Sequence, residues 1–320
     1  MKNILVSGAS GIIGYGILRS LKKVKNGLHL IGTTIYSDSV AQGFCDIFEL
    51  APLTSDANYI NWLTNIIEKH KVDLIIPGID VDMYNWARNI NRIEKTGAKV
   101  MINNLDLISL CDDKWLFYEN LGKIDTPYRI DSSINSNFDE LTSRFGLPFL
   151  LKPRHGFGSK GIVKVDGKDT FLKYEGDIGP QLMAQPIIGS DDEEYTTSAF
   201  CDGKGGYYTN ITLRRKLSKD GFTEKAEVAA ISDINTAVSI LVKYFRPIGP
   251  TNFQFRQHNG VFKLLEINPR ISSSTSIRTA FGYNESQMSV EYFLENKIPK
   301  QPQIKLGRAV RYVEDYIFYL

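Results

Sequence analysis

The chain has 320 residues, of which 42% are hydrophobic and 23% are charged, as is ordinary for a globular protein. Its 38 basic and 36 acidic residues leave a net charge of +2, which gives no support for a nucleic-acid partner or for binding to a membrane surface. No run approaches the roughly 18 apolar residues that a transmembrane helix needs. The length suits two or three domains of roughly 100–200 residues each.

The N-terminal residues MKNILVSGAS lead directly into a strand pattern, without the apolar stretch and cleavage site of a signal peptide. The three cysteines are widely spaced and form no CxxC pair, and the four histidines form no HExxH or HxxxH pair. We therefore expect neither a disulfide framework nor a zinc site, and we expect a cytoplasmic location.

Strand and helix patterns alternate through the first hundred residues. The expected strands are short apolar runs at 4–7, 28–34, 73–77 and 98–102. The expected helices between them are the patterns at 12–24, 59–70 and 82–96. This alternation predicts an α/β domain with a doubly wound parallel sheet over residues 1–105.

The rest of the chain has an α+β pattern with an antiparallel sheet. A helix is expected over 112–121 and another over 233–245. The expected strands cover 149–152, 161–165, 195–201, 207–217, 251–257 and 261–268. Asn259-Gly260 is the typical dipeptide of a two-residue hairpin turn, so the last two strands are expected to pair. We divide this part into a smaller unit, 106–180, and a larger unit, 181–320.

A glycine-rich turn, Gly8 to Gly14 in the pattern GxxGxxG, lies between the first strand and the first helix. Such a turn can hold a phosphate at the helix N-terminus, or it can be a tight connection that packs closely. Reductases and epimerases with this spacing also carry Tyr-x-x-x-Lys, which none of the 16 tyrosines provides. We expect the turn to be structural or to line an acceptor pocket, with an NAD-dependent oxidoreductase as an alternative.

A second glycine-rich segment begins at Lys152, which ends a predicted strand and precedes three glycines between residues 156 and 161. A lysine at a strand end can point its charge at a phosphate, and glycine amides can close over it. The alternative is a basic hairpin on the surface.

The two strands of the Asn-Gly hairpin carry an acid and two amides. Period-two alternation places Glu266 and Asn268 on one face, and Gln254 can lie across from them. Carboxylate and amide oxygens suit Mg²⁺ (or Mn²⁺), and Arg270 extends toward the same centre. The alternative is a solvated polar face of the sheet.

Taken together, these segments resemble ATP-grasp enzymes, most closely one half of the large chain of carbamoyl-phosphate synthetase and similar stand-alone ligases. The resemblance covers nearly the whole chain. It depends on four motifs: the DK pair at 113–114, KPxxGxGSxG at 152–161, EYT at 194–196 and ExNPR at 266–270. It implies a two-lobed ATP-grasp domain, with an antiparallel sheet, behind the parallel-sheet domain.

The resemblance also implies a role for each matching residue. The phosphates of ATP would contact Lys114 and Lys152, beneath a flexible lid that includes Gly156, Gly158, Ser159 and Gly161. The adenine would meet a hinge that includes Gln185 and Ile187, and the ribose would meet Glu194. The metal ligands would be Gln254, Glu266 and Asn268. The transferred phosphoryl group would be stabilised by Arg270, with added charge from Arg214 or instead from Arg215 or Lys216.

The sequence departs from the synthetase in three ways. It has no Cys-His-Glu amidase motif, and its hinge reads Gln-Pro instead of Gln-Glu. The serine-rich segment 272–276 replaces a second arginine, which puts bicarbonate as the substrate in doubt.

The implied activity is that of a ligase that uses ATP and Mg²⁺. It would activate a small carboxylate as an acyl phosphate for attack by an amine and release ADP and phosphate. A catalytically silent nucleotide-binding subunit is an alternative, and a homodimer is left open.

Overall fold

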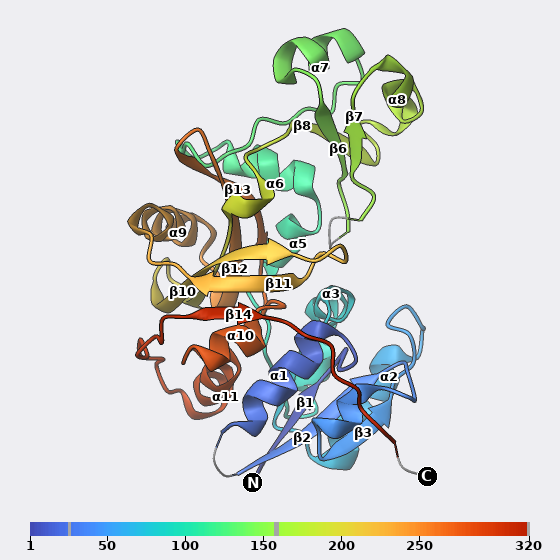
Figure 1. Ribbon diagram of the computed structural model, residues 1–320. Coiled ribbons are helices and arrows are strands. Elements are labelled where there is room, and N and C mark those ends of the chain that lie inside the picture. Colours follow the sequence, from blue (N-terminus) through green and yellow to red (C-terminus); the bar gives the residue numbers. More distant parts are fainter. Residues whose placement is uncertain (25–26, 157–159, 319–320) are drawn as a thin grey trace.

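The protein is described by a computed structural model that covers residues 1–24, 27–156 and 160–318 (Figure 1). Three sheets follow one another along the molecule: a parallel sheet near the N-terminus, a large antiparallel sheet in the middle and a small antiparallel sheet at the far end. The predicted fold class, a parallel-sheet domain followed by antiparallel lobes, is confirmed. None of the helices in the described part of the chain has the length and apolar character needed to cross a membrane.

The N-terminal domain is a five-stranded parallel sheet in the order β3-β2-β1-β4-β5. Its strands are β1 (Lys2–Val6), β2 (Leu28–Thr34), β3 (Ile47–Leu50), β4 (Leu74–Ile76) and β5 (Lys99–Val100). Its helices are α1 (Ile12–Lys22), α2 (Tyr59–His70), α3 (Asp80–Arg88) and α4 (Ile90–Glu94), with a 3-10 turn η1 (Val40–Gly43). Apolar clusters fill both faces of the sheet, as its nearly continuous apolar strands predict.

Two details of this domain differ from the sequence prediction. The short strand β3 was not expected, and the helix expected over 82–96 is divided into α3 and α4 at Asn89. The Asn89 side chain donates to the carbonyl of Asn85 at 2.9 Å, the kind of local bond with which asparagine competes with helix continuation.

The small lobe is a three-stranded antiparallel sheet in the order β7-β6-β8. Its strands are β6 (Phe149–Pro153), β7 (Val163–Val165) and β8 (Leu182–Pro186). Its helices are α7 (Phe138–Phe145) and α8 (Lys168–Leu172), with a 3-10 turn η2 (Glu175–Asp177). Phe149, Leu151 and Phe171 form its fully buried centre, which fixes the strand that carries Lys152.

The large lobe is a six-stranded antiparallel sheet in the order β13-β12-β9-β10-β11-β14. Its strands are β9 (Glu194–Asp202), β10 (Tyr207–Leu217), β11 (Thr223–Val228), β12 (Ile248–His258), β13 (Val261–Asn268) and β14 (Arg308–Val310). Around it lie α5 (Leu105–Cys111), α6 (Lys114–Leu121), α9 (Ser232–Phe245), α10 (Thr275–Ala280), α11 (Glu285–Glu295) and the turn η3 (Asp191–Glu193). Asn259 and Gly260 both have positive φ, which is what the predicted hairpin turn requires.

The N-terminal domain and the large lobe are joined by several contacts. Helices α10 and α11 pack against α1, and the Thr279 hydroxyl donates to the Ser20 hydroxyl at 2.9 Å. The segment after β14 crosses from the large lobe to the N-terminal domain (Figure 1). There the Tyr316 ring lies against Gly43, where a Cβ atom would approach the ring to 2.3 Å. These contacts hold the two parts together around the cavity described next.

Candidate nucleotide and metal site

A cavity of about 490 Å³ lies where the small lobe, the large lobe and the N-terminal domain meet. An adjoining cavity of about 240 Å³ shares several of its walls. Nine of the residues that sequence reasoning selected line one or both of them: Lys114, Lys152, Gly156, Gln185, Glu194, Gln254, Glu266, Asn268 and Arg270. The fold therefore brings together motifs that are far apart in the sequence.

Two lysines supply positive charge at one side of this cavity. Burial lowers the pKa of Lys152, and the positive charges of Lys114 and Arg256 lower it further, while Glu266 opposes them. Lys114 begins α6, whose N-terminus is capped by the side chain of Asp113, and its Nζ donates to the carbonyl of Gly156 at 2.6 Å. Cations that are poorly solvated and close together are stabilised by an anion such as a phosphate.

Glu266 and Asn268 lie on the same face of β13, as alternation predicted. The Asn268 Nδ2 atom donates to Glu266 Oε1 at 2.9 Å. No donor among the described residues reaches Glu266 Oε2 or Asn268 Oδ1, so one carboxylate oxygen and one amide oxygen face the cavity without a partner. Oxygen donors of this kind fit Mg²⁺. The described residues contain no group of three His, Cys, Asp or Glu that could hold a metal, so such a site would use amide and phosphate oxygens as well.

Gln254 lies opposite Glu266 across β12 and β13, and a register shift between Gln254 and Phe255 brings the two residues together. Its Oε1 atom, however, accepts a hydrogen bond from Arg215 Nη2 at 2.6 Å. The carbonyl oxygen that was expected to bind a metal therefore already has a protein partner, which leaves it one further lone pair for a ligand.

Glu194 is buried, with 3% of its surface exposed, and both of its oxygens are bound by arginines. Oε1 accepts from Arg215 at 2.8 and 3.1 Å, and Oε2 accepts from Arg256 at 2.6 Å. Sequence reasoning did not select Arg256, although it follows Gln254 by two residues on the same face of β12. Period-two alternation was the signal that could have found it.

Arg214 does not line either cavity, which corrects its expected place near the phosphates. Its Nε atom donates to the carbonyl of Asp192 at 2.7 Å, and its guanidinium pairs with Glu193 at 3.1 Å and Glu227 at 3.7 Å. Neighbouring residues of a strand point to opposite faces, so the next residue, Arg215, enters the cavity instead.

The hinge and the glycine-rich loop match the expectation only in part. Gln185 lines both cavities, and its Nε2 atom donates to Ser132 Oγ at 2.7 Å. Ile187 does not line them, whereas its neighbour Ile188 does. Gly161 lies outside both linings. Gly158 and Ser159 lie outside the described residues.

Arg270 reaches the cavity edge in a buried ion pair that crosses between domains. Its Nε and Nη2 atoms donate to the two carboxylate oxygens of Asp80 at 2.7 and 2.8 Å. Burial alone would lower the pKa of Arg270, but the Asp80 carboxylate raises it above its ordinary value. Nothing in the local sequence pattern pointed to Asp80, because the pair joins residues 190 positions apart.

The serine-rich segment after Arg270 takes part in a buried polar network. Arg278, fully buried, donates to Ser272 Oγ at 2.9 Å, to Asn252 Oδ1 at 2.6 Å and to Glu285 Oε1 at 3.1 Å. Neither cavity is lined by Arg278, so this arginine holds the end of the ExNPR segment in place.

The glycine-rich turn at Gly8–Gly14 packs as closely as its structural interpretation requires. A Cβ atom on Gly14 would lie 2.3 Å from the carbonyl oxygen of Gly8, and one on Gly78 would lie 2.1 Å from that of Ser7. Close backbone approach therefore accounts for glycine at these positions whether or not a ligand binds.

Two family models each match a part of the chain. Residues 9–101 match the PylC-like N-terminal domain, and residues 180–316 match the family described as ATP-grasp in the biosynthetic pathway with Ter operon. The large chain of carbamoyl phosphate synthase from Thermotoga sp. (strain RQ2) is 22% identical, over 100% of this chain and 32% of its own length. That from Methanothrix thermoacetophila is also 22% identical, over 78% and 26%. The chain thus spans about a third or less of these relatives.

Solved structures of ATP-grasp ligases share the fold. N5-carboxyaminoimidazole synthetase from Staphylococcus aureus, complexed with ADP, has a TM-score of 0.73 and 17% identity, over 95% of this chain and 80% of its own. Biotin carboxylase from Campylobacter jejuni also has a TM-score of 0.73 and 17% identity, over 96% and 74%. The part of the chain over residues 180–316 thus matches an ATP-grasp family, and the chain as a whole is similar to a region of the carbamoyl phosphate synthase large chain.

Proposed function

We propose that the protein is an ATP- and Mg²⁺-dependent ligase that joins a small carboxylic acid to an amine and releases ADP and phosphate. The observation that carries this proposal is the meeting of two cationic side chains, Lys114 and Lys152, with the oxygen pair of Glu266 and Asn268 in one cavity. Solved relatives of the same fold were crystallised with ADP or with an ATP complex.

The two lysines would hold the phosphates of ATP, and Gln185 and Ile188 would lie at the adenine end. Glu266 and Asn268 would hold Mg²⁺, which neutralises charge on the phosphates and so favours phosphoryl transfer. In this arrangement residues 1–105 serve as the acceptor-side domain, 106–180 as the small lobe with the glycine-rich loop, and 181–320 as the large lobe. To bind the ribose, Glu194 would have to give up a hydrogen bond from Arg215 or Arg256 and accept one from a ribose hydroxyl instead.

The reaction needs no covalent intermediate on the protein. The protein positions the substrates and stabilises charge. A carboxylate oxygen of the substrate attacks the γ-phosphorus, the bond to the bridging oxygen of ADP breaks, and an acyl phosphate forms. The amine nitrogen then attacks the acyl carbon, phosphate leaves, and the nitrogen loses a proton. Lys152 and Arg270 would stabilise the negative charge that develops on the transferred group, Arg270 while it remains paired with Asp80.

The test uses hydroxylamine as a general amine, because it converts acyl phosphates into hydroxamates. The protein is incubated with Mg²⁺, ATP, hydroxylamine and a panel of carboxylic acids. Hydroxamate is measured as its ferric complex, and nucleotides are separated by anion exchange. We expect ADP and hydroxamate in equal amounts, dependent on one class of acid. AMP as the main product would contradict acyl phosphate formation, and ADP that does not depend on an acid would reduce the activity to that of an ATPase.

A further inference from the structure

A third cavity, of about 640 Å³, lies in the N-terminal domain at the carboxyl ends of β1, β2 and β3, beside α3. This edge of an open parallel sheet is where ligands commonly bind, and the volume suits a small molecule with a ring. Gly11, Ile79 and Val81 line both this cavity and the larger cavity of the candidate nucleotide site. The two spaces are therefore neighbours that share one wall.

Several of the side chains that line this cavity are large, apolar and exposed to solvent. Ile35, Tyr36, Leu53 and Val81 all line it, and they are 42%, 56%, 59% and 44% exposed. Large apolar side chains that gather at one exposed place mark a binding site more often than they occur by chance.

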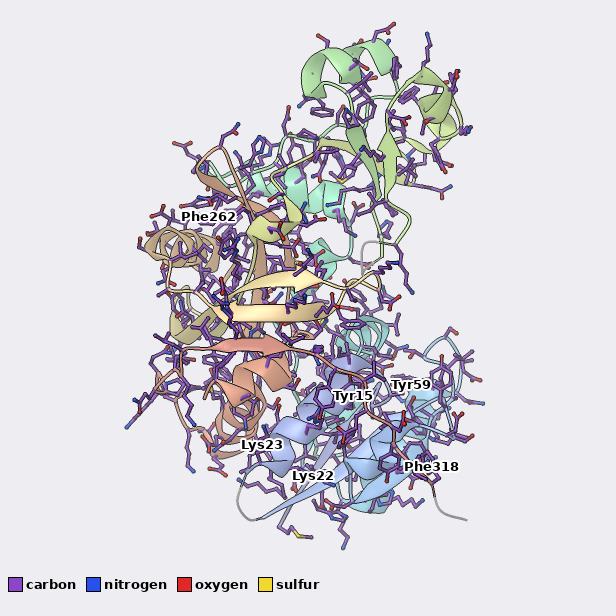
Figure 2. The ribbon with its side chains drawn as sticks, viewed as in Figure 1. Tyr15, Lys22, Lys23, Tyr59, Phe262 and Phe318 are labelled. Carbon is purple, nitrogen blue, oxygen red and sulfur yellow. The ribbon has the colours of Figure 1, made fainter. Side chains whose placement is uncertain are left out.

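The polar groups at the base of the cavity already have partners. Asp82 Oδ1 accepts from Thr54 at 2.5 Å and from Tyr59, labelled in Figure 2, at 2.8 Å. The hydroxyls of Ser10 and Thr34 lie 2.8 Å apart. Arg88 is the one cation among the lining residues, all of which the structure describes. The cavity therefore lacks the clustered positive charge that a phosphate-rich ligand would need.

The wall that the two cavities share lies beside the ion pair of Asp80 and Arg270. Asp80, between Ile79 and Val81, holds Arg270, and both Asp80 and Arg270 line the larger cavity. Asp80 already balances the charge of Arg270, but Lys114 and Lys152 line the same larger cavity and have no ion-pair partner among the described residues. A molecule whose apolar part filled the third cavity would extend its polar end toward these lysines, which favours a carboxylate.

We propose that the third cavity holds the apolar, ring-sized body of the acid substrate, whose carboxylate reaches the nucleotide site past Gly11 and Val81. This inference rests on the proposed ligase function and adds the chemical class of the acid. It selects aromatic or branched apolar acids and disfavours acids without an apolar body, such as acetate, and dicarboxylic acids.

The experiment compares phenylacetate, hydrocinnamate and indole-3-acetate with acetate and succinate in the hydroxamate assay. Binding of phenylacetate is measured separately by calorimetry in the presence of MgADP. The test variant is Leu53→Asp, which lies outside the nucleotide site, and the matched control is Leu306→Asp, another exposed leucine that lines none of the three cavities. We expect kcat/KM to be about tenfold or more higher for the apolar acids. Leu53→Asp should remove about the same factor, with MgADP affinity unchanged, and Leu306→Asp should change neither.

Preference for acetate or succinate, phenylacetate binding that is unaffected by Leu53→Asp, or no binding of any apolar acid would each overturn the inference. These results differ from a failure of the proposed function. If MgADP does not bind while phenylacetate binds in a way that Leu53→Asp weakens, the ligase proposal fails and the assignment of the cavity to an apolar acid stands.

Discussion

Arg270 and Asp80 form a bidentate ion pair that joins the end of β13 to the start of α3, and so joins the large lobe to the N-terminal domain. Both side chains are buried, each residue with 8% of its surface exposed. A third bond, from Arg270 Nη1 to the carbonyl of Ile271 at 3.1 Å, fixes the plane of the guanidinium. The arginine that ends the ExNPR motif is therefore oriented by a residue of another domain.

Removing Asp80 should destabilise the protein strongly, because it leaves a buried guanidinium without its counter-ion. We expect Asp80→Ala to lower the free energy of unfolding by about 3–5 kcal/mol. The control is Asp112→Ala, since Asp112 pairs with exposed Arg88 only at 4.0 Å and should cost less than about 1 kcal/mol. Urea denaturation measures both. A double-mutant cycle with Arg270→Met should show strong coupling, and additive effects would contradict a direct role of the pair.

Glu266 should be essential for turnover and of little importance for folding. Its one side-chain hydrogen-bond partner among the described residues is Asn268, so Glu266→Gln removes the charge that would hold Mg²⁺ and breaks no ion pair between described residues. We expect ADP formation to fall by about a hundredfold or more, with the melting temperature nearly unchanged. Glu119→Gln, at an exposed position of α6, is the control and should keep normal turnover. Normal activity in Glu266→Gln would remove this residue from the metal site.

The neighbouring arginines 214 and 215 offer a matched pair of variants. Arg214→Gln removes exposed ion pairs and should change stability by less than about 1 kcal/mol, with ATP affinity unchanged. Arg215→Gln frees one oxygen of buried Glu194 and the carbonyl of Gln254, so it should cost about 3 kcal/mol and weaken ATP binding. Urea denaturation and calorimetry below the melting transition measure the two effects. Equal ATP affinities in the two variants would contradict the conclusion that Arg215, and not Arg214, acts on the nucleotide site.

Much of this architecture could be predicted because it depends on local patterns. Alternating strands and helices identified the parallel sheet, and Asn259-Gly260 identified the hairpin of β12 and β13, although not the register shift that sets Glu266 against Gln254. Spacing alone placed Glu266 and Asn268 on one face. Each of these features follows from the pattern of residues that are neighbours in the sequence.

Apart from Arg256, which alternation along β12 could have indicated, the site features that were missed depend on contacts between distant segments. Asp80 meets Arg270 only after two domains have packed, and no periodic pattern in either segment indicates that pairing. Which of Arg214 and Arg215 faces the cavity depends on how β10 is placed in the sheet, and their adjacency alone left both open. The hydrogen bond from Arg215 to Gln254 could not be predicted either, because Arg215 lies on β10, two places from β12 in the sheet order.

The pKa of Lys152 is lowered, so nucleotide binding should weaken as the pH rises. This weakening should begin at a lower pH than it would if Lys152 had the pKa of an ordinary lysine. The protonated amine attracts phosphate, and burial lowers its pKa, so the charge is complete below that pKa and is lost as the pH rises through it. Affinity for the β,γ-imido analogue of ATP, measured by calorimetry from about pH 7 to about pH 10, should therefore fall toward the alkaline end. Lys152→Arg keeps its charge over this range and should flatten the profile. Lys164→Arg, on the exposed side of β7, should leave it as in the wild type. A profile that is equally steep in Lys152→Arg would show that another group, and not Lys152, controls the pH dependence.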